Sequence, residues 1–154
     1  MNDKKLKICL AASAGGHLVQ LLKVADCWQS YDRFFVTTSD AVAKKLSAQG
    51  NVFVVGESNR NNPFKMLMVL SKCISIIIKE RPDVVLSTGA AHGCLLCLIG
   101  KLFGAKVVWL DSIANTEKLS FSGRIVRPFA NLILTQWPGV AKKYKNVEFA
   151  GSVV

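Results

Sequence analysis

The sequence has few acidic residues and no apolar segment long enough to cross a membrane. Ten Asp and Glu residues stand against twenty Lys and Arg residues, which gives the 154-residue chain a formal net charge of +10. We therefore expect an anionic partner. Because no Lys/Arg-rich run or RNA-binding aromatic motif occurs, we do not expect this partner to be nucleic acid. The longest apolar segment, residues 66–78, contains Lys72 and falls short of the ~20 residues that span a bilayer, so no transmembrane helix is predicted.

Known signatures of nucleotide and metal binding are also missing. The glycines near the N-terminus do not form the dinucleotide fingerprint G-x-G-x-x-G, and no lysine follows them as a P-loop requires. A free-standing nucleotide-binding domain is therefore disfavoured. Cys94 and Cys97 form an isolated C-x-x-C without a second Cys or His pair. We expect the five cysteines to be buried, reduced thiols, and we expect neither a metal nor a cofactor.

The sequence does contain a regular alternation of short apolar runs and helical patterns. Runs typical of buried strands occur at 7–11, 33–37, 52–55, 84–87, 107–110 and 132–135, with a short one at 147–149. Helical patterns occupy 17–28, 40–49, 64–79 and 94–103, and a short helix is expected within 123–131. This alternation predicts one domain, residues 1–154, with an α/β fold built on a Rossmann-like, doubly wound parallel sheet.

Three of the predicted strands end in residues that suit a binding site. The first runs into a glycine turn and a helix that opens at His17, the fourth into a second glycine turn, and the fifth into Asp111 and Ser112. Because the carboxyl ends of parallel strands share one edge, we expect these residues to surround a crevice. The predicted binding residues are Ser13, Gly15, Gly16, Thr88, Gly89, His92 and Ser112.

The chemistry of this group favours transfer of a group to a phosphate-bearing acceptor. Backbone amides in glycine turns and at a helix N-terminus suit a diphosphate. His17 or Asp111 could take a proton from an attacking hydroxyl, which makes both candidate catalytic residues. The alternative is that the glycines only allow tight turns, and that His17, His92 and Asp111 only cap helices or loops.

The predicted helix at 64–79 is apolar on more than one side and basic at its margins. Phe64, Lys65, Met66 and Lys72 are candidates for contact with an anionic membrane surface, and Arg60 adds charge just before the helix. In the alternative interpretation, a neighbouring helix covers the apolar surface inside the protein.

The same motifs resemble a known family. The turn at 13–17, the STGAAHG turn at 87–93, and Asp111-Ser112 followed by LSFSGRIVRPFANLILTQWP at 119–138 are similar to the asparagine-linked-glycosylation-fourteen family and its bacterial capsule and exopolysaccharide counterparts of the PssD/CpsF type. The resemblance implies the N-terminal, acceptor-binding half of a GT-B glycosyltransferase. A separate chain would supply the nucleotide-sugar half, and the acceptor would be a sugar linked to polyprenyl diphosphate.

The resemblance also assigns roles to residues. Gly15, Gly16 and His17 would face the acceptor diphosphate, the Gly89 turn would line the cleft, and the C-terminal tail would meet the partner chain. The expected activity is inverting transfer from a UDP-sugar, only with the partner present. The alternative is a non-catalytic anchor that recruits and activates the catalytic subunit.

Two departures from the family pattern affect these expectations. Eukaryotic members carry an N-terminal membrane helix that this sequence lacks, so we expect peripheral attachment at the cytoplasmic face of the cell membrane. The family often has glutamate where this chain has Asp111.

Overall fold

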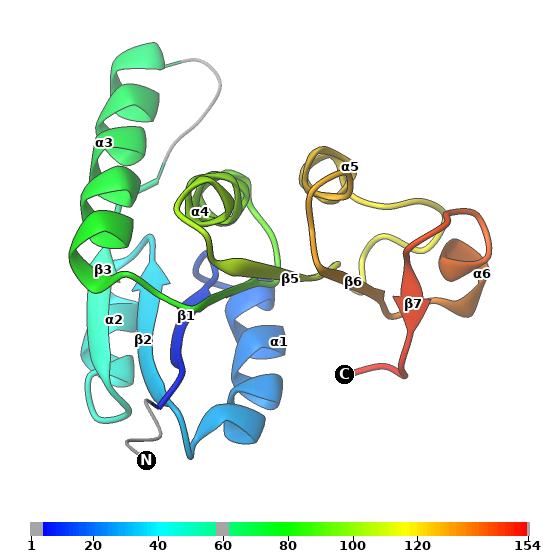
Figure 1. The fold of residues 1–154 in the computed structure, drawn as a ribbon, viewed down its shortest axis with the longest axis horizontal. Coiled ribbons are helices and arrows are strands. Elements are labelled where there is room, and N and C mark those ends of the chain that lie inside the picture. Colours follow the sequence, from blue (N-terminus) through cyan, green and yellow to red (C-terminus); the bar gives the residue numbers. More distant parts are fainter. Residues whose placement is uncertain (1–4, 58–61, 154) are drawn as a thin grey trace.

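The fold is a parallel sheet covered by helices on both faces. The computed structural model describes residues 5–57 and 62–153 (Figure 1). Within these residues the strands form a seven-stranded sheet in the order β3-β2-β1-β4-β5-β6-β7, and all neighbouring strands are parallel. The strands are β1 (Lys7–Ala11), β2 (Asp32–Thr37), β3 (Asn51–Val54), β4 (Val84–Ser87), β5 (Lys106–Leu110), β6 (Leu132–Thr135) and β7 (Glu148–Phe149). The predicted fold class is confirmed.

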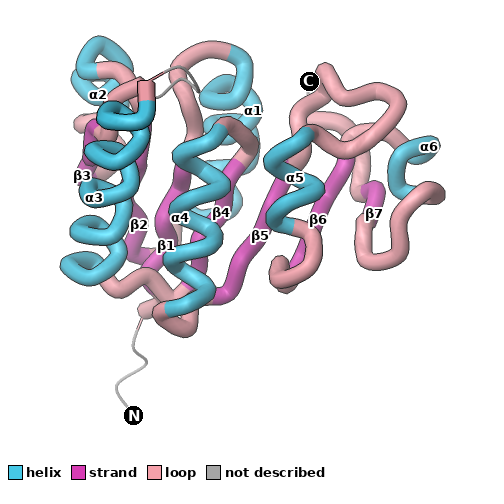
Figure 2. The backbone as a smooth tube through the Cα atoms, turned by 90° about the horizontal axis from the view of Figure 1, so that it is seen from above, coloured by secondary structure: helices cyan, strands magenta, loops and turns pink. Residues whose placement is uncertain are grey.

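The helices divide between the two faces of the sheet. They are α1 (Gly16–Ala25), α2 (Asp40–Leu46), α3 (Pro63–Glu80), α4 (Ala91–Leu102), α5 (Phe121–Val126) and α6 (Pro138–Ala141), with a 3₁₀ turn at Asp26–Trp28. One face is covered by α1 and α2, and the other by α3, α4 and α5 (Figure 2). Alternate residues of β1 enter the two cores: Ile8 and Leu10 face α1, whereas Cys9 and Ala11 face α3 and α4. The side chains of residues 8–11 are therefore buried on both faces of β1.

Strand order reverses between β1 and β4. From β1 the chain moves outward to β2 and β3, then α3 returns it to the other side of β1 as β4. The loops after β1 and β4 consequently leave the carboxyl edge of the sheet in opposite directions and leave space between them. This reversal point is where open parallel sheets bind ligands.

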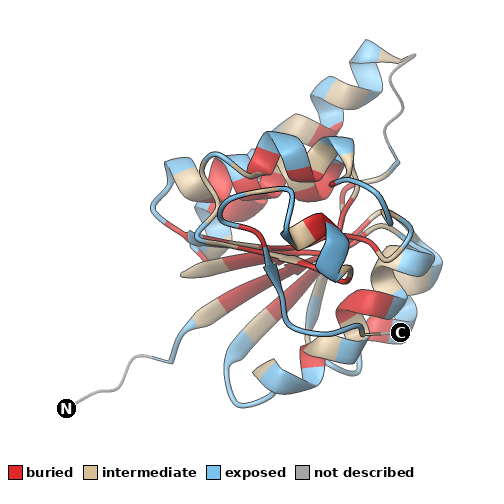
Figure 3. Ribbon diagram, turned by 90° about the vertical axis from the view of Figure 1, so that its right-hand side faces the viewer, coloured by how far each residue is buried: buried red, intermediate tan, exposed pale blue. Residues whose placement is uncertain are grey.

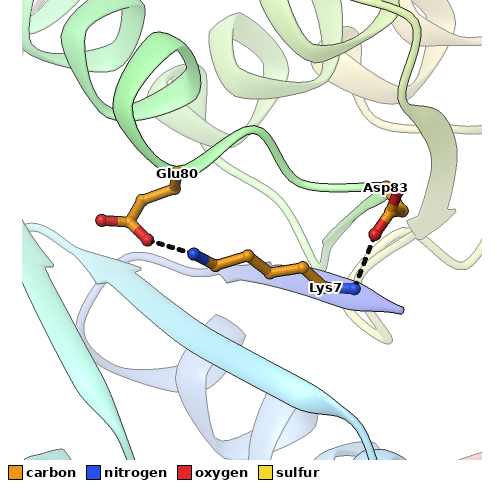
Figure 4. Close-up of polar contacts among 3 residues, drawn as sticks. All are labelled: Lys7, Glu80 and Asp83. Atoms are coloured by element: carbon orange, nitrogen blue, oxygen red, sulfur yellow. Dashed lines mark hydrogen bonds and ion pairs between the residues drawn. The ribbon is translucent and has the colours of Figure 1, made fainter. Parts of the chain in front are cut away.

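Polar contacts fix the opposite edge of the sheet. Lys7 at the start of β1 pairs through Nζ with Glu80 Oε2 at 2.6 Å, and its backbone N–H donates to Asp83 Oδ2 at 2.8 Å (Figure 4). Arg81 between these acids adopts the left-handed conformation with φ 44° and closes α3. The end of α3 is thereby tied to the start of the central strand.

Some helix boundaries differ from the predicted ones. Helix α4 begins at Ala91 instead of Cys94, which places His92 in its first turn. Helix α5 begins at Phe121, because Ser120 Oγ accepts from the Gly123 N–H and caps the helix there. Helix α6 was not predicted: Pro138 occupies its first turn, where proline is well tolerated, instead of only ending β6. Helix α2 ends at Leu46, three residues before the predicted end.

The prediction that all five cysteines are buried was wrong in part. Cys9, Cys73 and Cys97 are buried and burial raises the pKa of each thiol, but Cys27 is exposed and Cys94 is half-buried. The end of helix α4 at the amino edge of the sheet also exposes apolar side chains. These are Leu98, Leu102 and the adjoining Phe103. Only one stripe of α4 faces the sheet and α3, so its apolar composition exceeds what the core can cover.

Candidate functional site

The turn between β1 and α1 forms one side of the site. Gly15 has φ +98°, a conformation that strains any residue with a side chain, and it is the cap of α1. In the part of the chain that the structure describes, no side chain caps α1, so its first-turn amides remain available to a ligand. Gly15 and Gly16 are exposed, and Ser13 beside them is half-buried. This is the geometry of an anion site at a helix N-terminus.

His17 joins this turn to the turn after β4. Its Nδ1 lies 2.9 Å from the carbonyl oxygen of Thr88, and Thr88 Oγ1 donates to the carbonyl oxygen of His17 at 2.7 Å. Because a carbonyl oxygen only accepts, we assign the ring proton to Nδ1, which leaves the lone pair of the neutral ring on Nε2. His17 is half-buried at the rim, and this tautomer is the one a general base requires.

Gly89 makes the contact between the two turns possible. A Cβ at position 89 would lie 2.3 Å from Cε1 and 2.4 Å from Nδ1 of the His17 ring, and Gly89 has φ +143°. Gly89→Ala is therefore expected to displace His17 and to lower the free energy of unfolding by about 2–4 kcal/mol. Chemical denaturation measures this loss.

Gly104→Ala is the matched control for this prediction. Gly104 has a positive φ of +91°, but a Cβ there would meet nothing within 4 Å. The control carries the backbone strain without the clash, so its expected loss is about 1–2 kcal/mol. Equal losses in the two variants would contradict the proposed packing of His17 against Gly89.

His92 lies on the other side of the second turn and borders a cavity. Its side chain is 3% exposed, and its Nε2 has no hydrogen-bond partner among the described residues. The cavity has a volume of about 300 Å³ and is lined by Ser13, Ala14, Thr38, Glu57, Ala90, Ala91 and His92. Burial lowers the pKa of His92 to about 4, opposed by a backbone hydrogen bond with Ala12 and reinforced by His17. His92 is therefore neutral at pH 7, and it can offer a ligand a hydrogen bond but no charge.

The low pKa of His92 predicts a loss of stability in acid. The unfolded chain takes up a proton at this position below pH 6.5, whereas the folded chain does so only near pH 4. As the pH falls between these values, the free energy of unfolding therefore decreases by up to about 1.4 kcal/mol for each pH unit. The stability contributed by the neutral His92 is fully present above pH 6.5. We expect His92→Gln to flatten the fall in unfolding free energy over this range. Parallel curves for the two proteins would contradict a buried neutral imidazole.

Asp111 serves the structure of the rim instead of facing the crevice. It is 1% exposed, and its Oδ1 accepts from Trp109 Nε1 at 2.9 Å and from Ser120 Oγ at 2.5 Å. Its Oδ2 accepts from the Ser120 N–H at 2.8 Å. This carboxylate ties β5 to the start of α5 and is already surrounded by donors, so the geometry does not support its predicted role as a proton acceptor.

Two buried glutamines also belong to the rim, and the sequence pattern did not predict them. Gln20 on α1 and Gln136 after β6 are 4% and 3% exposed and bond to each other, and Gln20 also donates to Ser112 Oγ. Gln136 directly follows β6 as Asp111 directly follows β5, and this shared position is the signal that could have found it. Nothing in the sequence marks Gln20, which lies within an ordinary amphipathic helix.

The structure therefore brings part of the predicted group together. The turn after β1, with Ser13, Gly15, Gly16 and His17, meets the turn after β4, with Thr88, Gly89 and His92. Ser112 lies after β5, the next strand of the sheet, and is connected to the first turn of α1 through Gln20. Among the described residues, no cluster of three or more His, Cys, Asp or Glu side chains could hold a metal.

The fold and the site define a Rossmann-like α/β protein with a polar rim at the reversal point of its parallel sheet. The family model described as "Oligosaccharide biosynthesis protein Alg14 like" matches residues 8–153, so the chain belongs to the Alg14 family. The predicted family is thereby confirmed, while the bacterial PssD/CpsF subtype stays a prediction.

Curated relatives carry the same family name. The alg14 subunit of Schizosaccharomyces pombe is 37% identical over 121 residues, a match that covers 73% of this chain and 58% of that protein. The human ALG14 subunit is 22% identical over 182 residues, covering 98% of this chain and 84% of the human one. Both are described as UDP-N-acetylglucosamine transferase subunits.

Solved structures share the fold at low sequence identity. MurG of Acinetobacter baumannii superposes with a TM-score of 0.77 at 18% identity, over 96% of this chain and 46% of MurG. UDP-GlcNAc 2-epimerase of Methanocaldococcus jannaschii superposes with a TM-score of 0.72 at 10% identity, again over 96% of this chain and 46% of the other. The chain thus spans less than half the length of either structural neighbour, and these two likenesses establish the fold alone.

Proposed function

We propose that this chain is the acceptor-binding subunit of a split, inverting glycosyltransferase. A separate chain binds UDP-N-acetylglucosamine, and the sugar passes to an acceptor sugar linked to polyprenyl diphosphate. The observation that carries the proposal is the pair of glycine turns joined by His17 and Thr88 at the reversal point. The names of the relatives support the donor sugar. Assembly of capsule or exopolysaccharide repeat units stays a prediction from the resemblance.

In this proposal each part of the site has a task. The free first-turn amides of α1 and the uncapped N-terminus of α4 hold the diphosphate, because both helix ends carry partial positive charge. His17 Nε2 receives the proton of the acceptor hydroxyl while the hydroxyl oxygen bonds to the anomeric carbon of the donor. The bond from that carbon to UDP breaks, and UDP leaves with the electron pair. Attack from the face opposite UDP inverts the anomeric configuration.

Binding of a diphosphate by the chain alone tests the acceptor site. In calorimetric titrations we expect farnesyl diphosphate to bind at least ten-fold more tightly than farnesyl phosphate, because only the diphosphate reaches both turns. We expect UDP-N-acetylglucosamine to bind weakly to the chain without its partner. Tight binding of UDP-N-acetylglucosamine would instead indicate a free-standing nucleotide-binding domain. Full transferase turnover by the chain alone would contradict a division of the enzyme between two chains.

A second proposal concerns peripheral attachment to the cytoplasmic face of the cell membrane through α3. The N-terminal end of this helix projects beyond the rest of the molecule (Figure 3). Its exposed apolar side chains are Phe64, Leu67, Met68, Ile74 and Ile78, interleaved with the exposed Lys65, Lys72 and Lys79. Met66 is half-buried and so belongs less to this surface than predicted. Arg60 lies outside the described residues. A basic, apolar helix face of this kind suits the headgroup region of an anionic bilayer.

Sedimentation with liposomes tests the membrane proposal. We expect the chain to pellet with vesicles of phosphatidylglycerol and phosphatidylcholine, and to remain in solution with phosphatidylcholine alone. The double variant Lys65→Glu, Lys72→Glu is expected to lose most of this binding, because each basic residue contributes about 1 kcal/mol near an anionic surface. Lys142→Glu, Lys145→Glu is the control, since these exposed lysines lie beyond α6. Equal loss in both double variants would contradict a specific α3 surface.

Among the described residues, no helix is both long and apolar enough to span a membrane.

A further inference from the structure

Two buried amide side chains connect parts of the rim that are distant in the sequence. Gln20 belongs to the second turn of α1 and Gln136 follows β6, 116 positions later. Gln136 Nε2 donates to Gln20 Oε1 over 2.6 Å, and neither side chain is more than 4% exposed. The bond therefore lies inside the protein, directly behind the first turn of α1.

The remaining contacts of Gln20 bind it to that first turn and to the segment after β5. Its Nε2 donates to the Gly16 carbonyl at 3.3 Å and to Ser112 Oγ at 3.4 Å. Its Oε1 accepts from the Ile113 N–H at 3.2 Å. Because a backbone carbonyl only accepts and an N–H only donates, these partners fix which way the amide points.

The contacts of Gln136 are equally directional. Its Nε2 also donates to the Asp111 carbonyl at 3.1 Å. Its Oε1 accepts from the Val153 N–H at 3.1 Å and from Ser152 Oγ at 3.4 Å. Through one side chain, the segment after β5 and the C-terminal tail are held against α1. Both amides use the hydrogen-bonding capacity of their oxygen and nitrogen, so burial leaves neither group unsatisfied.

We propose that Gln20 and Gln136 are positioning residues for the transfer reaction. The inference rests on the proposed function, because the turn they hold is the proposed diphosphate site. Two apolar side chains in their place would pack at several alignments, whereas the amide pair satisfies its partners at only one. A shift in this pair moves Gly16, whose amide lies next to the acceptor. Displacement of a reacting group by 1 Å costs about 100-fold in rate.

Glutamate substitutions distinguish the contribution of Gln136 from that of Gln20. Gln136→Glu replaces the donor by a second acceptor, which then faces both Gln20 Oε1 and the Asp111 carbonyl. Gln20→Glu keeps the acceptor for Gln136 and Ile113, and loses only the two longer bonds. Gln29→Glu is the control, because Gln29 is exposed just beyond α1. The assay uses the chain co-purified with its partner, with UDP-N-acetylglucosamine and a phytanyl-diphosphate-linked N-acetylglucosamine acceptor.

For Gln136→Glu at pH 8 we expect kcat to fall about 30- to 100-fold while KM for UDP-N-acetylglucosamine stays unchanged. The ratio of variant to wild-type kcat is expected to rise as the pH falls toward 6, because a buried glutamate takes up a proton and regains a donor. Gln20→Glu should lose only a few-fold, and the control nothing. Wild-type kcat in a folded Gln136→Glu variant would overturn the proposal, and so would a loss confined to KM for the donor. If Gln136→Glu does not fold, Gln136→Met takes its place, with the same expected loss of kcat at every pH.

Amide hydrogen exchange on the chain alone tests the positioning without any assay of activity. The Val19 N–H bonds to the Gly15 carbonyl, and the Val153 N–H bonds to Gln136. Gln136→Glu is expected to accelerate exchange at both amides, whereas Gln29→Glu leaves both unchanged. Unchanged exchange at Val19 in the Gln136 variant would overturn the proposal. If the wild-type pair shows no transfer, the proposed function fails, and the exchange at Val19 still decides whether Gln136 holds the turn.

Discussion

Replacing His17 by alanine is expected to lower kcat of the transferase pair about 10²- to 10⁴-fold, with the fold intact. The reason is the bond between Nδ1 and the Thr88 carbonyl, which leaves the unprotonated Nε2 as the proton acceptor at the rim. Without the ring, the acceptor hydroxyl must lose its proton to water. The half-buried ring makes one hydrogen bond to the described residues, so its removal costs little stability. Steady-state kinetics and thermal unfolding of the same preparation measure the two quantities.

Val19→Ala is the control for this experiment, because Val19 lies on α1 two residues away and is 54% exposed. It should keep both turnover and stability. Unchanged kcat in the His17→Ala pair, together with normal assembly, would support the alternative in which the chain only anchors and activates the catalytic subunit.

Replacing Asp111 by alanine is expected to lower the free energy of unfolding by about 3–5 kcal/mol. Three donors lose their acceptor at once: Trp109 Nε1, the Ser120 N–H and Ser120 Oγ. Trp109 is fully buried and has no access to water as a replacement, so the penalty of an unsatisfied donor applies in full. Urea denaturation of the isolated chain measures the effect.

Ser120→Ala separates the parts of this network. It removes the Oγ contact with Asp111 and the cap on α5, but it leaves the backbone N–H in place. The expected loss is about 1–2 kcal/mol, clearly smaller than that of Asp111→Ala. Asp111→Asn tests whether the carboxylate acts in catalysis instead of in the fold. A variant that unfolds like the wild type but has lost its turnover would restore the predicted role of Asp111 as a catalytic carboxylate.

The strands were predictable because each is a short apolar run at a strand-like spacing. The predicted bounds of β1, β4 and β6 agree with the structure to the residue. Helix starts were less predictable where no side chain caps them. Helix α4 begins after Ala90, which has φ 69°, a conformation that alanine rarely adopts and that no local pattern indicates.

The candidate site was predictable only as far as its backbone requirements. Glycine turns are visible in a sequence because the chain needs glycine there, and both turns lie where they were expected. The direction of a polar side chain at the end of a strand is not visible in the same way. Asp111 turns inward because Trp109 and Ser120 offer donors, and both contacts depend on how β5 and α5 pack. Apart from Gly16, the partners of Gln20 come from segments more than 90 residues away in the sequence, and they are Ser112, Ile113 and Gln136.

The order of the strands has a consequence for the nascent chain. The central strand β1 is made first, but its second neighbour, β4, begins at Val84, 77 residues after Lys7. At a synthesis rate of roughly 5–20 residues per second, the edge of β1 that pairs with β4 stays unpaired for about 4–15 seconds while the intervening residues are synthesised. During this interval an apolar strand that is buried on both faces in the finished protein exposes unpaired backbone groups. Chaperone dependence during translation should therefore be greatest before residue 87 has left the ribosome.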